Sequence, residues 1–248
     1  MKKILALAAA LLMVAGVCTA QEVNKIRTIQ LGENFYCIDD PGSRQFFFVG
    51  TDKVILVDTG FGKYKLTPVI RKISDLPIEV VLTHGHVDHI GGLQEFGECY
   101  ACEKDFPMLP ENIKKKPLKD GDKIDIGNFV FDIIEIPGHT EGSIILLEKN
   151  KKFMIAGDSV QEGPIYMFGD ISKFDTYIES MQKLMEYSAS AEKIYSAHNT
   201  LSYGPEYIQY CIEDAMLFRE GKITPEKTEI HGRKCNVYRG QHVSFFAD

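Results

Sequence analysis

The pattern of apolar and polar positions predicts two groups of short strands with helices between and after them. In the first group, β-branched and aromatic runs are separated by Gly, Asp and Pro signals. The elements predicted there are strands at 26–30, 35–38, 45–49 and 54–57, a helix at 63–74 and a strand at 78–82. We expect the first four strands to form an antiparallel meander that opens the domain.

The second group of strands follows a loop-rich middle region and leads into two longer helices. The elements predicted there are strands at 123–126, 129–136, 144–148 and 153–156, an amphipathic helix at 173–187, a strand at 193–196 and a helix at 205–221 that ends at a glycine. Two groups of strands with helices laid outside them predict an α/β fold, a four-layer αβ/βα sandwich.

The first twenty residues have the pattern of a signal peptide. Two lysines precede an apolar run at 4–17, and small residues end at Ala20 before Gln21. The run of about fourteen apolar residues is short for a membrane span, which needs about twenty. We predict cleavage after Ala20, a periplasmic or secreted protein, and one domain at 21–248. The alternative is lipid attachment at Cys18, although Val17 is bulkier than the residue usual before such a cysteine.

Length and composition fit one enzyme-sized domain with a large core, and the charge argues against a nucleic-acid partner. The 248 residues are 44% hydrophobic, which suffices for a large core. The net charge of −7 argues against a nucleic-acid groove, which needs clustered Lys and Arg. We interpret the basic run Lys114-Lys115-Lys116, which Pro117 follows, as a solvated loop. No integral membrane span and no nucleic-acid partner are expected, and the oligomeric state is left open.

The cysteines do not indicate a disulfide framework. After signal cleavage five would remain, an odd number: Cys37, Cys99, Cys102, Cys211 and Cys235. Cys99 and Cys102 form a lone C-x-x-C without a second pair and without the surroundings of a thioredoxin-like site. A local disulfide and two ordinary thiols both stay open for this pair.

Histidines are concentrated directly after predicted strands. The segment 83–89 reads THGHVDH and follows the apolar strand at 78–82. Five of the seven histidines occupy such polar segments: His84, His86, His89, His139 and His198. Neutral imidazole and carboxylate are ligands that suit Zn²⁺, and strand-end loops can leave coordination positions open as a catalytic metal requires. This pattern predicts a catalytic metal site.

The chain resembles the metallo-β-lactamase superfamily of metal-dependent hydrolases over nearly all of the sequence after residue 20. The H-x-H-x-D-H motif of the superfamily matches His84 to His89, and its Pro-Gly-His segment matches Pro137-Gly138-His139. Its Gly-Asp pair matches Gly157-Asp158, and its last histidine matches His198. The resemblance implies that His84, His86 and His139 hold one metal. It implies that Asp88, His89 and His198 hold the other, and that Asp158 bridges the two. The expected cofactor is Zn²⁺, two ions per chain, with iron and manganese as alternatives.

The chemistry of two metals explains these residue types. Two cations sharing a hydroxide lower the pKa of water towards about 7 and polarise the oxygen of a carbonyl or phosphoryl group. A bridging Asp158 offsets the repulsion between the cations. We expect Asp88 and Asp58 to take part in catalysis, Asp58 by holding a ligand imidazole in the correct tautomer. A turn-capping role before Gly60 is an equal alternative for Asp58.

Asp158 also narrows the activity that the resemblance implies. True β-lactamases of the superfamily place Cys or Ser at this position, and flavin-linked oxygen reductases carry Glu where His86 stands. Glyoxalase II and lactone hydrolases share the aspartate, but the segment after His198 is short for a glutathione-binding domain. We therefore predict hydrolysis of a small ester, thioester or lactone. The alternatives are a mononuclear iron oxygenase like persulfide dioxygenases, a β-lactamase-type amide hydrolase, and a binding protein with a vestigial site.

Two segments that hold no predicted ligand are candidates for substrate selection. Residues 161–170 are apolar, directly follow the Gly-Asp pair and are expected either to wall the cleft or to form a core loop. Residues 230–246 are expected to form a hairpin over the site. Arg233 or Arg239 in that hairpin is a candidate to bind a substrate carboxylate.

Overall fold

The computed structural model describes residues 26–248, so the predicted signal peptide, its cleavage after Ala20 and the alternative at Cys18 lie outside the described residues. Within these residues, the first sheet has seven strands whose spatial order is their order along the chain: β1 (Arg27–Gly32), β2 (Phe35–Asp39), β3 (Gln45–Val49), β4 (Val54–Val57), β5 (Ile78–Val81), β6 (Glu98–Cys102) and β7 (Lys114–Leu118). Strands β1 to β4 pair antiparallel, which is the predicted meander, and β4 to β7 pair parallel.

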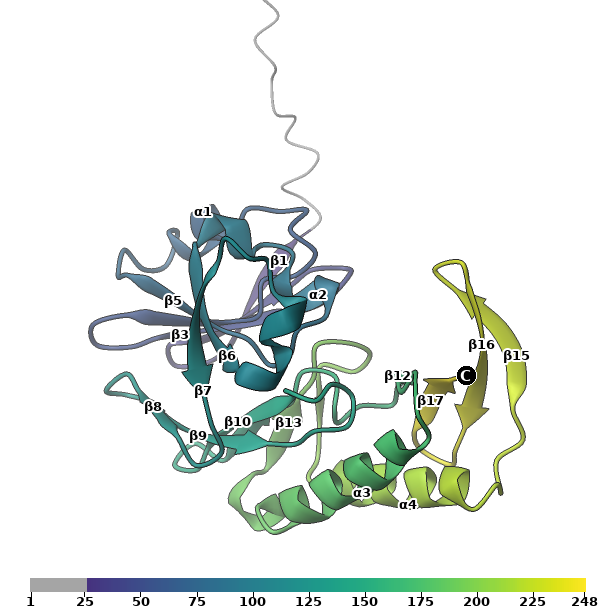
Figure 1. The fold of residues 1–248 in the computed structure, drawn as a ribbon. Helices are drawn as coiled ribbons and strands as arrows, with labels where there is room; N and C mark the ends of the chain where they lie inside the picture. The colour runs from purple at the N-terminus through teal and green to yellow at the C-terminus, as the bar shows by residue number, and fades with distance from the viewer. Residues whose placement is uncertain (1–25) are drawn as a thin grey trace, which may run out of the picture.

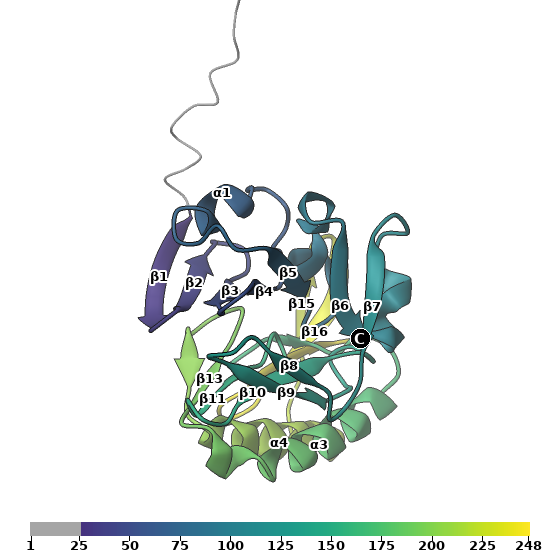
Figure 2. The ribbon, with the colours of Figure 1, turned by 90° about the vertical axis from the view of Figure 1, so that its left-hand side faces the viewer.

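A second sheet faces the first, and helices cover the outer sides of both (Figures 1 and 2). Its order is β14-β13-β11-β10-β9-β8, with β8 (Lys123–Asp125), β9 (Val130–Glu135), β10 (Ile144–Glu148), β11 (Phe153–Ile155), β13 (Lys193–Tyr195) and β14 (Ser202–Tyr203). Figure 2 shows α3 (Ser172–Met185) and α4 (Glu206–Arg219) below this sheet and α1 (Thr67–Ile70) above the first. The predicted four-layer sandwich is confirmed.

The core explains why these residues form strands. In β3, Phe46 and Phe48 point between the two sheets, whereas Phe47 packs on the outer side of the first sheet with Leu66 and Ile70. This alternation is the period of two expected for a strand buried on both faces. The Phe48 ring packs 4.7 Å from that of Phe131 in β9, and burying each such ring stabilises the fold by about 1.5–3 kcal/mol.

The helix predicted at 63–74 is wrong in length, because only α1, one turn, is helical there. Pro68 lies in the first turn, where its missing N–H costs nothing, and so the helix begins beside it. The backbone N–H groups of Leu66 and Thr67 donate to the carboxylate of Glu95 instead of to a capping side chain of their own segment. The helical spacing of apolar residues reflects one buried turn rather than a long helix.

The loop-rich middle region contains two strands, β6 and β7, that were not predicted from the sequence. The interpretation of Lys114 to Lys116 as a solvated loop is wrong, since these residues lie in β7 at the edge of the first sheet. Lys114 and Lys116 pair with Glu98 of β6, at 3.3 Å and 2.7 Å. Charged side chains on an edge strand discourage pairing with another chain, so a lysine run is compatible with a strand there.

A third sheet, also not predicted, is built from the C-terminal segment and one short strand near the centre. Its order is β12-β17-β16-β15, with β12 (Ile165–Tyr166), β15 (Glu226–Ile230), β16 (Arg233–Arg239) and β17 (Ser244–Ala247). Figure 1 shows the β15–β16 hairpin standing out from the two main sheets. The buried Asp214 of α4 accepts hydrogen bonds from the backbone of Gln241, His242 and Val243, which fixes the turn before β17.

The short helices and the cysteines complete the fold. The remaining helix is α2 (Val87–Ile90), and single 3₁₀ segments span Leu93–Glu95, Glu103–Met108 and Ser188–Ser190.

The five cysteines within residues 26–248 are all free and buried, so Cys99 and Cys102 are two thiols and not a local disulfide. Burial raises the pKa of Cys99 to about 11, which leaves it protonated and unreactive near neutral pH. No helix in the described part of the chain is long and apolar enough to cross a membrane.

Candidate metal centre

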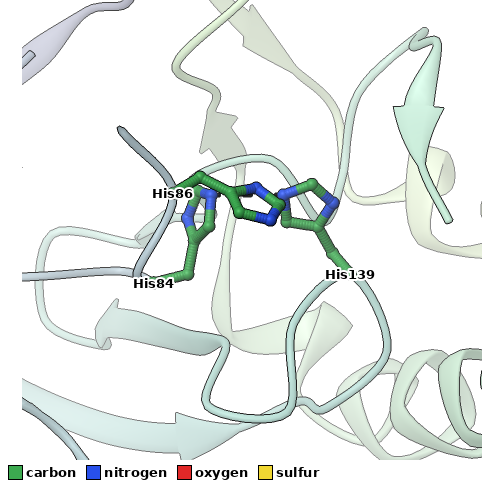
Figure 3. Close-up of side chains that lie close together, drawn as sticks. All are labelled: His84, His86 and His139. Atoms are coloured by element: carbon green, nitrogen blue, oxygen red, sulfur yellow. Dashed lines mark hydrogen bonds between the residues drawn. The ribbon is translucent and has the colours of Figure 1, made fainter. Parts of the chain in front are cut away.

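Three of the predicted histidines converge in one cluster, which we call the three-histidine site. His84 and His86 lie in the loop after β5, and His139 lies in the loop after β9. Their imidazole rings approach edge to face, with centroids 4.5–4.8 Å apart, and point toward a common space (Figure 3). One nitrogen of each ring lies within 4.8 Å of the others, a spacing that one cation can span.

The other predicted ligands converge in a second cluster, the Asp–His site. Asp88 and His89 belong to α2, Asp158 follows β11, and His198 follows β13. The Nε2 atom of His198 lies 3.0 Å from Asp88 Oδ2 and 3.3 Å from Asp158 Oδ1, and the ligand atoms of all four residues lie within 4.8 Å of one another. The structure thus brings together all seven ligand residues predicted from the sequence.

Asp158 lies between the two clusters and presents one oxygen to each. Its Oδ1 atom is 3.2 Å from the Nε2 atom of His89, in the Asp–His site. Its Oδ2 atom is 3.6 Å from the Nε2 atom of His139, in the three-histidine site. A carboxylate in this position can contact two cations at once, which is the geometry that a bridging role requires.

Three imidazoles are oriented by acceptors on the side away from the clusters. His89 Nδ1 donates to Asp58 Oδ2 at 2.8 Å, and His139 Nδ1 donates to the Tyr166 carbonyl at 3.0 Å. The Thr83 hydroxyl donates to Asp58, so it accepts from His84 Nδ1 at 3.1 Å. Each contact places a proton on Nδ1 and directs Nε2 into its cluster, so that Nε2 offers its lone pair to a metal when the ring is neutral. Asp58 has the contact expected of a residue that fixes a ligand tautomer.

Two buried polar atoms in the Asp–His site fit a cation rather than a hydrogen bond. His89 Nε2 and Asp158 Oδ1 are buried and make no hydrogen bond, although they lie 3.2 Å apart. Leaving buried polar atoms unsatisfied costs about 1–3 kcal/mol each. A cation between them would satisfy both, and imidazole nitrogen with carboxylate oxygen is a donor set suited to zinc.

The two sites differ in the protonation of their histidines. Burial lowers the pKa of His84, His86 and His139, that of His139 to about 3, so these rings are neutral near pH 7. Burial opposes protonation of His89 and His198 as well. In these two, however, the carboxylates of Asp58, Asp88 and Asp158 outweigh burial and raise the pKa, that of His198 to about 9. A metal ion must displace protons from the Asp–His site but not from the three-histidine site.

Asp105 supports the three-histidine site and was not found from the sequence. It is 1% exposed, and its Oδ2 accepts from Gly85 N at 2.7 Å and from Thr140 Oγ1 at 2.8 Å, while Oδ1 accepts from Gly142 N at 2.8 Å. It therefore joins the loop of His84 and His86 to the loop of His139. The only signal in the sequence was an aspartate in a region interpreted as loop, which is too common to single out.

A cavity of about 770 Å³ opens over both sites and has mainly apolar walls. Gln161, Gly163, Pro164 and Tyr166 line it, so the prediction that 161–170 forms a wall is confirmed there, whereas Met167 is buried in the core. The predicted C-terminal hairpin contributes Ile230 and His231, and β17 contributes Phe246.

The two candidate arginines of the hairpin lie elsewhere. Arg233 pairs with Asp248 at 2.5 Å and stacks on the Phe168 ring, while Arg239 pairs with Glu226 at 3.4 Å. Neither lines the cavity, so the expectation that one of them binds a substrate carboxylate is not supported.

Comparisons with known proteins agree with this geometry. The sequence model of a family described as the metallo-beta-lactamase superfamily matches residues 39–198, a span that contains all seven predicted ligand residues. Acyl-coenzyme A thioesterase MBLAC2 of Gallus gallus is 26% identical over 197 residues, covering 62% of this chain and 70% of the relative. Hydroxyacylglutathione hydrolase of Bdellovibrio bacteriovorus is 33% identical over 118 residues, covering 44% of this chain and 45% of the relative.

Solved structures show the same fold. A metallo-beta-lactamase family protein from Thermus thermophilus superposes with a TM-score of 0.64 at 16% identity, covering 79% of this chain and 85% of that one. A metallo-beta-lactamase from Pontibacter korlensis gives 0.63 at 17% identity, covering 77% and 99%. At these identities the likeness concerns the fold alone.

Proposed function

Because the chain belongs to the metallo-beta-lactamase superfamily and is a metal-dependent hydrolase, we propose that it binds two zinc ions and hydrolyses small esters, thioesters or lactones. The observation that carries this proposal is Asp158, whose two oxygens face the three-histidine site and the Asp–His site separately. A single mononuclear site would not require a carboxylate shared in this way.

Two zinc ions, when bound, would supply a nucleophile at neutral pH and polarise the carbonyl of the substrate. The protein's own residues orient and enclose the reaction. Asp58, Thr83 and the Tyr166 carbonyl hold three imidazoles in one tautomer, which keeps each Nε2 available. The Asp88 carboxylate, 3.0 Å from His198, is the group at the cavity wall suited to accept or hold a proton during the reaction.

The substrate class rests on the relatives and on residue 158. The two relatives described above are named as a thioesterase and as a hydrolase of hydroxyacylglutathione, itself a thioester, and this supports ester or thioester cleavage. An aspartate at 158, in place of the Cys or Ser of true β-lactamases, argues against antibiotic hydrolysis. The proposal extends to a periplasmic or secreted location, supported by the signal-peptide pattern at 1–20.

Hydrolysis of a chromogenic panel, with and without chelator, tests the proposed function. The panel contains esters, thioesters, lactones and a cephalosporin, and we expect turnover of one of the first three that chelator abolishes and zinc restores. Asp158→Asn should lower kcat/KM at least about 100-fold, since the variant loses charge at both sites. Glu141→Gln, at an exposed position, is the matched control and should retain full activity. Turnover of the cephalosporin alone, or turnover indifferent to chelator, would overturn the proposal.

A further inference from the structure

The cavity over the metal sites contains one cationic side chain that nothing in the proposed chemistry uses. Apart from the metal-ligand residues, Lys63 is the single lysine, arginine or carboxylate among the lining residues within the described chain. The rest of the lining is largely apolar, from Phe61, Val87, Pro164, Tyr166, Ile230 and Phe246. A cavity of about 770 Å³ with a few polar groups is typical of a small-molecule site.

The Lys63 ammonium is not engaged by a carboxylate. Within residues 26–248 no Asp or Glu oxygen lies within 4.0 Å of its Nζ atom, which instead sits 5.2 Å from the centroid of the Phe61 ring. Burial raises the pKa of the Asp40 carboxyl, and the charge of Lys63 opposes that rise without a direct contact; Asp40 Oδ1 accepts from the backbone N–H of Gly42. The two arginines of the third sheet, Arg233 and Arg239, are already paired with carboxylates.

The backbone that carries Lys63 is fixed by close packing against the metal-binding loop. Gly62 has a φ of +74°, and a Cβ there would meet the Gly91 carbonyl oxygen at 2.3 Å. Gly91, which follows α2, donates from its N–H to the Gly60 carbonyl at 2.8 Å. The Phe61 ring lies directly against Gly42, where a Cβ would be 2.7 Å from the ring. Lys63 is therefore presented at the cavity by a segment held to α2, which carries Asp88 and His89.

We propose that Lys63 is an anion-binding subsite of this cavity, and that the substrate is an ester or thioester with a negatively charged group on an otherwise apolar body. This inference rests on the proposed function, because it names the substrate class of the same site. An ammonium facing an apolar, partly enclosed space binds a carboxylate or phosphate more strongly than it would in open water. The apolar walls would receive the acyl chain while Lys63 sets its orientation.

Binding of thioether analogues to the zinc-loaded protein tests the subsite without requiring turnover. The probes are S-butyl thioethers of 3-mercaptopropionate, of phosphopantetheine and of N-acetylcysteamine, which carry a carboxylate, a phosphate and no charge. A thioether cannot be hydrolysed and can lie in the cavity in either direction. Isothermal titration of the wild type should show tighter binding of a charged probe than of the neutral one, and the tighter charged probe identifies the source of the anion.

Binding measurements on variants then test whether Lys63 causes the preference for charged over neutral probes. Lys63→Ala should weaken binding of the preferred charged probe about 5- to 20-fold and leave the neutral probe within twofold, and Lys63→Arg should retain most of the preference. Lys65→Ala, also exposed but not at the cavity, is the control and should change none of the three affinities. The preference should shrink in 0.5 M salt because the ammonium is exposed.

The subsite and the hydrolase proposal fail in different ways. Equal weakening of charged and neutral probes in Lys63→Ala, or no preference for charge in the wild type, overturns the subsite even if esters are hydrolysed. Loss of charge preference in Lys63→Ala, together with no hydrolysis of any ester, thioester or lactone of the panel by the zinc-loaded wild type, supports the subsite and overturns the hydrolase proposal.

Discussion

At the scale of single residues, the centre depends on acceptors that lie behind the histidines rather than in the cavity. Asp58 is the clearest of these, because it accepts from His89 Nδ1, from the Thr83 hydroxyl and from the Thr83 backbone N–H. It is 2% exposed and adopts a φ of +64°, so its position is fixed by the fold as well as by its partners. One carboxylate thus orients predicted ligands of both sites, His89 directly and His84 through Thr83.

Asp58→Asn should weaken metal binding without unfolding the protein. The amide of asparagine keeps one acceptor oxygen but replaces the other with an NH₂ group. That NH₂ group faces at least one of the three donors whose hydrogen bonds Asp58 accepts, so that hydrogen bond is lost. We expect about 10- to 100-fold weaker zinc binding at the Asp–His site, measured by competition with a chromophoric chelator. Asp52→Asn, at an exposed loop position, is the control. Unchanged affinity in Asp58→Asn would show that Asp58 only caps its turn, the alternative considered for it from the sequence.

Protonation of the histidines predicts that the two sites respond differently to pH. Without metal, carboxylates raise the pKa of His198 to about 9 and that of His89 well above its usual value, so both rings carry protons at pH 7. Zinc must displace these protons, so affinity at the Asp–His site should rise at least about tenfold per pH unit from pH 6 to 9. The three-histidine site, whose rings are already neutral, should bind zinc with nearly constant affinity over that range.

Two-site titration with zinc at several pH values measures this difference. The site with pH-independent affinity should be the one that His139→Ala removes. A parallel rise of both affinities with pH would contradict the assignment of charges to the two sites.

At the scale of elements, strands with clear alternation were predictable and elements set by distant partners were not. Strands β3, β4 and β10 lie where the apolar runs placed them, since each buries both faces in the core. Strand β7 begins with three lysines, a pattern that only an edge position explains, so it was not predicted as a strand. Its neighbour β6, which pairs with it, was not predicted either. The helix at 63–74 was overestimated because Pro68 and the contact of Glu95 with Leu66 and Thr67 restrict it to one turn.

The seven ligand residues were predictable for a different reason. The five histidines lie in short polar segments after apolar strands, where their unusual density makes the segments stand out from ordinary loops, whereas Asp88 and Asp158 were assigned as ligands from the motifs of the superfamily that the chain resembles. Their partners were not predictable, because Asp105, Thr83 and the Tyr166 carbonyl are common groups whose role depends on where distant loops meet. The third sheet was foreseen only as a hairpin, since its pairing of β12 with β17 joins segments about eighty residues apart.

The connection between ligand loops predicts a specific effect of Asp105. Asp105→Asn replaces one acceptor oxygen by an N–H donor, so the variant loses a bond to Gly85 or to Gly142 and loosens the three-histidine site. Zinc binding at that site should weaken about tenfold or more, while the Asp–His site changes less. Glu103→Gln, exposed on the same 3₁₀ segment, is the control. An equal loss at both sites, with a matching fall in thermal stability, would indicate general unfolding instead.

At the scale of the whole molecule, the candidate metal centre lies where the two main sheets meet. His84, His86, Asp88 and His89 follow β5 of the first sheet, whereas His139, Asp158 and His198 follow strands of the second. Each site takes ligands from both sheets. Ions bound there would link the two halves of the sandwich, and the unfolded chain lacks such a preformed site.

Metal removal should therefore lower the stability of the whole fold. Zinc at about 100 times its Kd stabilises by about 2.7 kcal/mol per site, which in a chain of this size raises the Tm by roughly 5–10 °C. Differential scanning calorimetry with zinc and after dialysis against chelator measures the change. Asp158→Asn, which weakens both sites, should show a much smaller response to zinc. Equal Tm values for wild type with and without zinc would contradict a link between the sheets.

The most direct test of this account is the metal content of the purified full-length protein, measured by inductively coupled plasma mass spectrometry after expression without added metal and after zinc supplementation. We expect close to two zinc ions per chain in the supplemented wild type and about one or fewer in His198→Ala. One iron per chain that zinc does not replace, or no bound transition metal under ample supply, would contradict the two-metal centre on which the proposed hydrolase depends.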